Sequence, residues 1–228
     1  MREINESLAA VLAPVRHVLL DFDGPVCSVF AGRPAAEVAA RMSAELVARG
    51  EELPAGIETE RDPLALLRRI DGARPELTAW VDGLLEQLEV EAVQVAAPNR
   101  EGEVTLKACA DSGRTVWMVS NNAGRAIQSY VELHGLQSYV AGVYGRVPGD
   151  PSSMKPSTRL LDDAMTAAAA KPEACVFIGD AVRDVEAANA AGIRSIGYAN
   201  KPGKAEALAA AGAAVVVGSM REIADALT

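Results

Sequence analysis

The sequence HVLLDFDGPVC, residues 17–27, decides how this chain folds. Its apolar first part belongs to a run at Val15–Leu20 that predicts a buried strand, and Gly24 permits a sharp turn just after it. Asp21 and Asp23 stand two residues apart where that strand ends, so their side chains point to the same side. Two carboxylates this close repel each other, and keeping both charged requires a cation. An Asp-Gly pair is also typical of an ordinary turn, so this stretch alone leaves both interpretations open.

Five further apolar runs resemble the first. They lie at Thr115–Val119, Val140–Tyr144, Cys175–Ile178, Ser195–Tyr198 and Ala214–Val217. These runs are too continuous for a sheet with one solvated face, so they predict parallel strands covered on both sides. Helices are expected between them, at residues 101–112, 123–134, 157–170, 182–191 and 202–211. This alternation predicts an α/β fold, a doubly wound Rossmann-like parallel sheet.

The interval between the first two expected strands breaks the alternation. Roughly a hundred residues separate them, far more than a strand-to-helix connection needs. Apolar residues recur there at helical spacing in three groups: Ala35, Val38, Met42 and Leu46; Leu64, Leu67 and Ile70; and Leu77, Trp80, Leu84 and Leu88. We therefore expect a small α-helical cap domain at residues 31–97, inserted after the first strand into a core domain of residues 1–30 and 98–228. An insertion that leaves from this end of a strand is placed to act as a lid.

A second acidic pair lies in FIGDAVRDVEAANAAG, residues 177–192. Asp180 follows another expected strand, and Asp184 falls in the first turn of the next helix, where acids are favoured by the helix dipole. Carboxylates on one such turn supply hard oxygen ligands, which suit Mg²⁺. A helix cap followed by a first-turn acid has the same pattern, so this alternative stays open.

Two polar segments lie between the acidic pairs. In WMVSNNAG, residues 117–124, a strand end before an expected helix carries Ser120, Asn121 and Asn122. Hydroxyl, amide and free N–H groups at such a place can cradle a phosphate. Helix capping explains the same residues. In MKPSTRLL, residues 154–161, Lys155 precedes a proline and is expected in a loop, where most lysines are simply solvated.

Composition limits the possible partners. The 228 residues carry a formal charge of −9, which argues against binding to nucleic acid or to an anionic membrane, since both need a positive field. A small anionic substrate is compatible, because a metal ion or a few cations can reverse the charge of one cleft. No apolar run is long enough to span a membrane, and the first residues lack the pattern of a secretory signal, so we expect a cytoplasmic protein. The three cysteines, Cys27, Cys109 and Cys175, are expected to be reduced packing residues.

Taken in order, these motifs resemble those of the haloacid dehalogenase (HAD) superfamily of phosphatases. Asp21-Phe-Asp23-Gly looks like the first motif, Ser120 the second, Lys155 the third, and Gly179-Asp180 with Asp184 the fourth. The expected insertion corresponds to the helical cap of phosphoglycolate phosphatases and β-phosphoglucomutases. The resemblance extends from about residue 15 to residue 217.

The resemblance implies a role for each matching residue. Asp21 would attack phosphorus and form an aspartyl-phosphate, and Asp23 would act as the acid and base. Mg²⁺ would be bound by the Asp21 carboxylate, the Asp23 carbonyl, Asp180 and Asp184. The phosphoryl oxygens would be held by Ser120, the Asn121 N–H and Lys155. The resemblance thus favours a Mg²⁺-dependent phosphatase that acts on a small phosphorylated metabolite.

Three alternatives remain. A phosphosugar mutase uses the same residues and differs chiefly in how its cap excludes water. A dehalogenase needs neither Asp23 nor a metal, so the second aspartate and the later acidic pair argue against it. The third is a non-catalytic phosphate-binding or signalling protein. A receiver domain is about half this length and has no cap, and a binding-only phosphatase relative is expected to have lost Asp21 or Asp23, which are both present.

Substrate specificity is expected to come from the cap. Arg33, at its entrance, is the candidate for contacting an anionic substrate, and Arg61, Arg68 and Arg69 are further candidates. Solvated arginines that balance nearby acids would give the same pattern.

Overall fold

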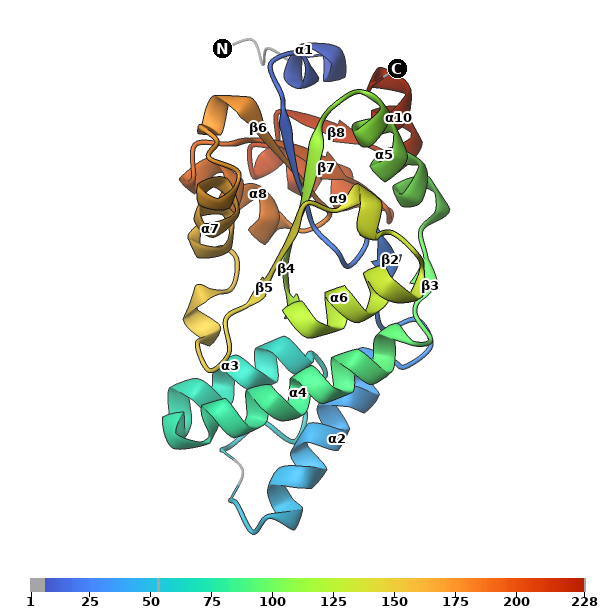
Figure 1. The fold of residues 1–228 in the computed structure, drawn as a ribbon. Coiled ribbons are helices and arrows are strands. Elements are labelled where there is room, and N and C mark those ends of the chain that lie inside the picture. Colours follow the sequence, from blue (N-terminus) through green and yellow to red (C-terminus); the bar gives the residue numbers. More distant parts are fainter. Residues whose placement is uncertain (1–6, 53, 228) are drawn as a thin grey trace.

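Six parallel strands form the centre of the protein. The computed structural model describes residues 7–52 and 54–227 (Figure 1). The strands are β1 (His17–Leu20), β4 (Thr115–Ala123), β5 (Gly142–Arg146), β6 (Cys175–Gly179), β7 (Arg194–Tyr198) and β8 (Val215–Val217). They follow the order β5-β4-β1-β6-β7-β8, so the strand that leads to Asp21 lies inside the sheet. All six expected strands are present, and the prediction of a doubly wound parallel sheet is confirmed.

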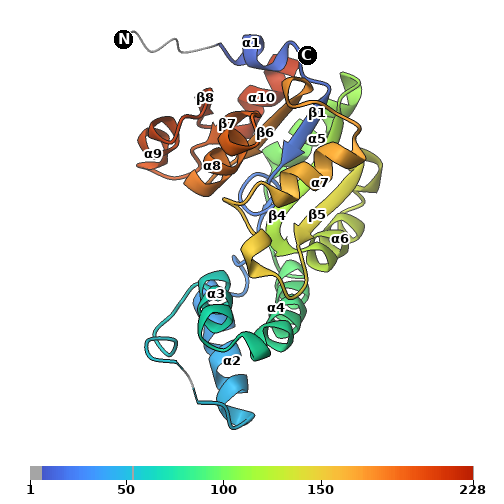
Figure 2. The ribbon, with the colours of Figure 1, turned by 90° about the vertical axis from the view of Figure 1, so that its left-hand side faces the viewer.

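Helices cover both faces of this sheet (Figures 1 and 2). One face carries α1 (Leu8–Leu12), α5 (Arg100–Asp111), α6 (Gly124–Leu133) and α10 (Met220–Leu227), and the other carries α7 (Arg159–Ala167), α8 (Val182–Ala190) and α9 (Lys204–Ala210). In β1, Val18 and Leu20 pack on the first face and Leu19 on the second. Because both faces are buried, the strands read as continuous apolar runs. The two terminal helices, α1 and α10, were not predicted.

The long interval after β1 forms three helices with a hydrophobic cluster of their own. These are α2 (Ala35–Ala48), α3 (Pro63–Ala73) and α4 (Thr78–Val93), and the buried residues they share include Met42, Leu67 and Leu85. Asp62 caps α3 by accepting the N–H groups of Leu64 and Ala65. The three helices lie beyond the carboxyl ends of the strands (Figures 1 and 2).

Two short strands connect these helices to the rest of the protein. β2 (Cys27–Ser28) leaves the turn after β1, and β3 (Ala97–Pro98) returns to α5; they pair antiparallel, Cys27 with Pro98 and Ser28 with Ala97. The outgoing and returning chain therefore pass side by side. Phe30, just past β2, packs against both the sheet cluster and the cluster of α2–α4.

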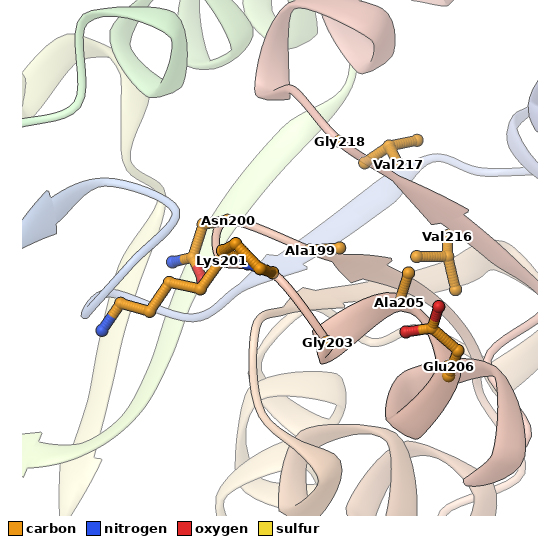
Figure 3. Close-up of a pocket in the computed structure, with 10 residues that line it drawn as sticks. Ala199, Asn200, Lys201, Gly203, Ala205, Glu206, Val216, Val217 and Gly218 are labelled. Atoms are coloured by element: carbon orange, nitrogen blue, oxygen red, sulfur yellow. The ribbon is translucent and has the colours of Figure 1, made fainter.

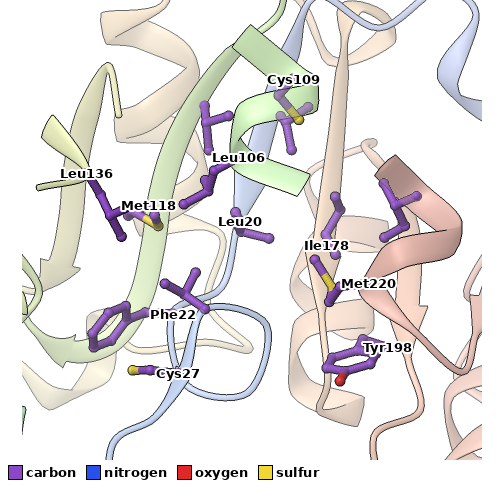
Figure 4. Close-up of a cluster of buried hydrophobic side chains, with 14 of the residues drawn as sticks. Leu20, Phe22, Cys27, Leu106, Cys109, Met118, Leu136, Ile178, Tyr198 and Met220 are labelled. Carbon is purple, nitrogen blue, oxygen red and sulfur yellow. The ribbon is translucent and has the colours of Figure 1, made fainter. Parts of the chain in front are cut away.

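The core beneath the site fixes the two aspartates of the first motif. Phe22 is fully buried in the cluster shown in Figure 4, and its ring meets that of Tyr130 edge to face at 5.2 Å between centroids. Because successive residues of an extended chain point to opposite sides, the burial of Phe22 turns Asp21 and Asp23 the other way. The cluster also holds Cys27 and Cys109, and all three cysteines are free and buried, as expected of packing residues.

None of the helices in residues 7–52 and 54–227 combines the length and the apolar character needed to cross a membrane.

Candidate active site

Asp21 directly follows β1, the strand that lies between β4 and β6. Leu20 pairs with Met118 of β4 and with Ile178 of β6, and the Asp21 N–H still donates to the Ile178 carbonyl at 2.8 Å. The Asp21 Oδ1 accepts the Phe22 N–H at 2.8 Å. The sheet thus fixes the backbone of Asp21, and its side chain is 10% exposed.

Lys155 is a buried cation that joins two of the expected site carboxylates. Its Nζ lies 2.9 Å from Asp21 Oδ1 and 2.8 Å from Asp184 Oδ1, and it donates to the Val119 carbonyl at 3.1 Å. Burial acts to lower the pKa of Lys155, but the charges of Asp184 and Asp21 outweigh it and raise the pKa. Lys155 is therefore a fixed positive charge rather than a solvated loop residue.

The positive charge that the protein places near Asp21, the nucleophile candidate, does not keep its carboxylate fully ionised. Burial raises the pKa of Asp21 to about 7; the Lys155 charge opposes this shift, while Asp184 and Asp180 add to it. Near neutral pH the protein chain by itself thus leaves Asp21 only partly ionised. A further cation beside these carboxylates would keep it charged.

Three carboxylates are arranged to hold such a cation. Oxygen atoms of Asp21, Asp180 and Asp184 lie within 4.8 Å of one another. The buried Asp184 Oδ1, although 2.8 Å from the Lys155 ammonium, has no donor aligned with it for a hydrogen bond. The ligand atoms that the three carboxylates offer are all hard oxygens, so this set fits Mg²⁺.

Two glycines make room for this acidic group. A Cβ on Gly24 would lie 2.6 Å from Asp180 Oδ2, and one on Gly179 would lie 2.5 Å from Asp184 Oδ2. Gly24 also has φ of +108°, a conformation that disfavours side chains. Asp180 Oδ2 is held by the Lys204 ammonium at 2.5 Å and by Asn200 Nδ2 at 2.8 Å, and Asp184 Oδ2 accepts the Asp180 N–H at 3.1 Å. The carboxylates are therefore held in place by neighbours on several elements.

β4 extends past its expected end at Val119 to Ala123. It lies on the other side of β1 from β6, the strand that leads to Asp180 and Asp184, and its last part is polar. Ser120, Asn121 and Asn122 are all buried. The Asn121 side chain binds the backbone of Lys155 twice: its Oδ1 accepts the Lys155 N–H at 2.8 Å and its Nδ2 donates to the Lys155 carbonyl at 3.2 Å. Asn121 thus fixes the loop that places the Lys155 ammonium.

In the described residues, the Asp23 carboxylate does not belong to the group formed by Asp21, Asp180 and Asp184. Its Oδ1 accepts the Val29 N–H at 3.0 Å. Burial raises its pKa; the Val29 N–H opposes the shift, the charge of Asp180 adds to it, and Lys201 and Arg183 oppose it. A raised pKa favours the protonated form, which a group that donates a proton to a leaving oxygen requires.

These residues enclose one small cavity of about 50 Å³. It is lined by Asp21, Asp23, Phe30, Leu64, Ser120, Asn121, Asn122, Lys155, Asp180 and Arg183. All four motifs found in the sequence therefore contribute to it. Phe30, Leu64 and Arg183 were not singled out as site residues, although Arg183 could have been noticed inside the fourth motif, directly before Asp184. Arg33 is not among the lining residues, because its guanidinium pairs with Glu91 of α4.

A larger cleft lies elsewhere. A cleft of about 500 Å³ lies between the loop after β7, helix α9 and strand β8, and Figure 3 shows residues that line it. Among its described lining residues Glu206 is the single acid, and Lys201 is the single cation. It therefore lacks paired carboxylates, and we place the chemistry in the smaller cavity.

Comparison with known proteins shows the family to which the chain belongs. A family model described as haloacid dehalogenase-like hydrolase matches residues 15–192. The chain belongs to this family. This HAD-like hydrolase is 33% identical over 190 residues to a phosphoglycolate phosphatase of Xylella fastidiosa, and the match covers 79% of each chain.

Solved structures of low sequence identity share its fold. A predicted phosphatase from Clostridium acetobutylicum is 19% identical and superposes with a TM-score of 0.70, over 92% of this chain and 97% of the other. CbbY from Rhodobacter sphaeroides, solved in complex with phosphate, is 16% identical with a TM-score of 0.66, over 92% and 96% of the two chains.

Proposed function

We propose that this hydrolase is a Mg²⁺-dependent phosphatase that acts on a small phosphorylated metabolite through an aspartyl-phosphate. The observation that carries this proposal is the position of the Lys155 ammonium between the buried carboxylates of Asp21 and Asp184. A carboxylate can attack an anionic phosphate only where cations compensate both charges. Its similarity to phosphoglycolate phosphatases supports the same chemistry.

In the proposed reaction an Asp21 oxygen attacks phosphorus, and the bond from phosphorus to the leaving oxygen breaks. Asp23 donates its proton to that oxygen, so the product leaves as an alcohol. Asp23 then takes a proton from a water molecule, whose oxygen attacks phosphorus. The bond between phosphorus and Asp21 breaks, and this releases inorganic phosphate and restores both aspartates.

The remaining site residues have supporting roles. When bound, Mg²⁺ would supply positive charge to the reacting oxygens. It would be held by the carboxylates of Asp21, Asp180 and Asp184 and by the Asp23 carbonyl. The phosphoryl oxygens would be held by Ser120, the Asn121 N–H and Lys155.

Residues 31–97 act, in this proposal, as a cap over a core of residues 1–30 and 98–228. Leu64 of α3 lines the cavity, so these helices contribute part of its wall. Arg183 is a better candidate than Arg33 for a second anionic group of the substrate. It lines the cavity, and in the described part of the chain no carboxylate lies within ion-pair distance of it. Arg68 of α3 lies near Arg183. The pKa of Arg68 is lowered chiefly by its burial and further by the charge of Arg183.

A screen of phosphate esters with Mg²⁺ tests the function, with 2-phosphoglycolate as the first substrate because of the named relatives. Release of inorganic phosphate is measured for wild type, for Asp21→Asn, and for wild type with a chelator. We expect turnover only for metal-loaded wild type. Equal phosphate release by wild type and Asp21→Asn from every active ester would refute the mechanism. A phosphosugar mutase would instead yield an isomeric phosphate ester.

A further inference from the structure

Helix α4 places two buried carboxylates against one buried arginine of the sheet. Arg146, at the end of β5, donates through Nε to Asp82 Oδ1 at 2.5 Å and through Nη1 to Glu89 Oε1 at 3.1 Å. The exposed fractions of the three side chains are 1% for Arg146, 7% for Asp82 and 0% for Glu89. Although burial acts to lower the pKa of Arg146, the charges of Glu89 and Asp82 outweigh it and raise the pKa. The group is therefore a charged, buried contact between α4 and the sheet.

Glu89 reaches further than this ion pair. Its Oε1 accepts Asn122 Nδ2 at 3.0 Å, and its Oε2 accepts the Ala123 N–H at 2.8 Å. An ionised carboxylate can only accept, so Glu89 fixes which end of the Asn122 amide faces it. The Asn122 Oδ1 consequently faces Ser120, whose Oγ lies 3.2 Å away.

Arg146 acts on the same segment from the other side. Its Nη1 also donates to the Asn121 carbonyl at 2.8 Å and thereby fixes the plane of the peptide bond between Asn121 and Asn122. Ser120, Asn121 and Asn122 all line the cavity that contains Asp21. One carboxylate of α4 and one guanidinium of β5 thus hold three successive lining residues.

We propose that Glu89 and Arg146 are positioning residues for phosphate binding. They hold the Ser120 hydroxyl and the backbone after it in the arrangement that receives a phosphoryl group, although neither residue lines the cavity. This inference rests on the proposed function, because it takes Ser120 and Asn121 as phosphate ligands. It assigns to α4 a role in binding the transferred group itself, beyond that of a lid.

Asp82 provides a matched control on the same helix. Like Glu89 it is a buried partner of Arg146, but its other oxygen accepts the Gly149 N–H at 2.6 Å, away from the segment of Ser120. Asp82→Asn and Glu89→Gln each remove one charge from the same ion group. A purely structural role predicts that both lower thermal stability and that neither changes phosphate affinity selectively.

The experiment measures binding of inorganic phosphate to the Mg²⁺-loaded protein by calorimetry, together with the melting temperature. We expect both variants to melt below wild type, Glu89→Gln to bind phosphate roughly tenfold more weakly, and Asp82→Asn to stay within about twofold of wild type. Equal phosphate affinity for wild type and Glu89→Gln overturns the inference, as does equal weakening in the two variants. A wild type that binds no phosphate overturns it as well.

Asn122→Ala keeps the inference testable if Glu89→Gln does not fold. This variant removes the connection between Glu89 and Ser120 but leaves the ion pairs of Arg146 in place, and we expect it to weaken phosphate binding. Unchanged binding in Asn122→Ala contradicts the inference. Ester hydrolysis is measured separately, so a protein that binds phosphate but hydrolyses no ester rejects the proposed function and leaves the positioning role standing.

Discussion

The Lys155 ammonium lies 2.9 Å from Asp21 Oδ1, and both side chains are almost entirely buried. The two residues come from sequence positions far apart, and the Asn121 side chain fixes the Lys155 backbone that completes the pair. Neighbouring carboxylates raise the pKa of Lys155, which keeps it positively charged. Burial opposes the ionisation of Asp21 beside it. In the proposed reaction, Lys155 therefore controls what fraction of Asp21 is ionised, and so able to attack, at a given pH.

Replacing Lys155 by methionine should impair catalysis and shift its pH dependence. The Lys155 charge lowers the pKa of Asp21, so its loss raises that pKa further, and ionised Asp21 appears only at higher pH. We expect kcat/KM to fall by roughly a hundredfold or more, with the acidic limb of its pH profile moved to higher pH. Lys107→Met, which removes an exposed cation paired with Asp111, serves as the control and should leave the profile unchanged. An acidic limb at the wild-type position would contradict this role of Lys155.

Binding of Mg²⁺ should release protons in a pH-dependent manner. With a pKa of about 7 in the metal-free protein, Asp21 is mostly protonated at pH 6 and mostly ionised at pH 8.5. A cation that binds the ionised form displaces the proton, so proton release should be large at pH 6 and small at pH 8.5. Calorimetric titrations in buffers of different ionisation enthalpy measure this release. Asp21→Asn should lose the difference between the two pH values; proton uptake by wild type would show that the sign is wrong.

Arg183→Ala should discriminate between substrates. In residues 7–52 and 54–227 no carboxylate forms an ion pair with the Arg183 guanidinium, which lines the cavity and is suited to a carboxylate on the substrate. We therefore expect KM for 2-phosphoglycolate to rise roughly tenfold. KM for ethyl phosphate, which lacks the carboxylate, should change much less. Arg33→Ala is the comparison, because Arg33 is engaged by Glu91 outside the cavity lining. A larger effect of Arg33→Ala than of Arg183→Ala would indicate that Arg33, and not Arg183, contacts the substrate carboxylate.

Phe22→Ala should destabilise the fold from directly beneath the site. Phe22 has no exposed surface and packs against Tyr130, so its truncation should cost about 3–5 kcal/mol of unfolding free energy. Urea denaturation measures the loss. Leu133→Ala, on the same helix as Tyr130 but 53% exposed, should change stability by less than about 0.5 kcal/mol. A loss for Phe22→Ala no greater than that of the control would show that Phe22 does not anchor the two aspartates.

The elements that place the site were predictable because their signals are local. Asp21, Ser120 and Asp180 each follow an apolar run, and the carboxyl ends of parallel strands meet at one edge of the sheet. The end of β4 was predicted too early, at Val119, because three polar residues normally signal a loop. Here they remain in the strand because buried partners satisfy them.

Those buried partners come from far along the chain, and this explains what could not be predicted. Glu89 is 33 residues from Asn122 and 57 from Arg146, and Arg33 is 58 from Glu91. Sequence spacing carries no signal for such pairs, because only the packed fold brings them together. Arg33 and Glu89 were thus indistinguishable from solvated charges on helix surfaces.

The buried contact between Arg146 and α4 limits how this protein can be re-engineered. Exchanging residues 31–97 for a segment without carboxylates at positions 82 and 89 would leave Arg146 without its two partners. A buried guanidinium left without its carboxylates costs about 3–5 kcal/mol, enough to unfold many domains of this size. A chimera designed to acquire a new substrate should therefore replace position 146 together with residues 31–97, so that both sides of this buried contact come from the same protein.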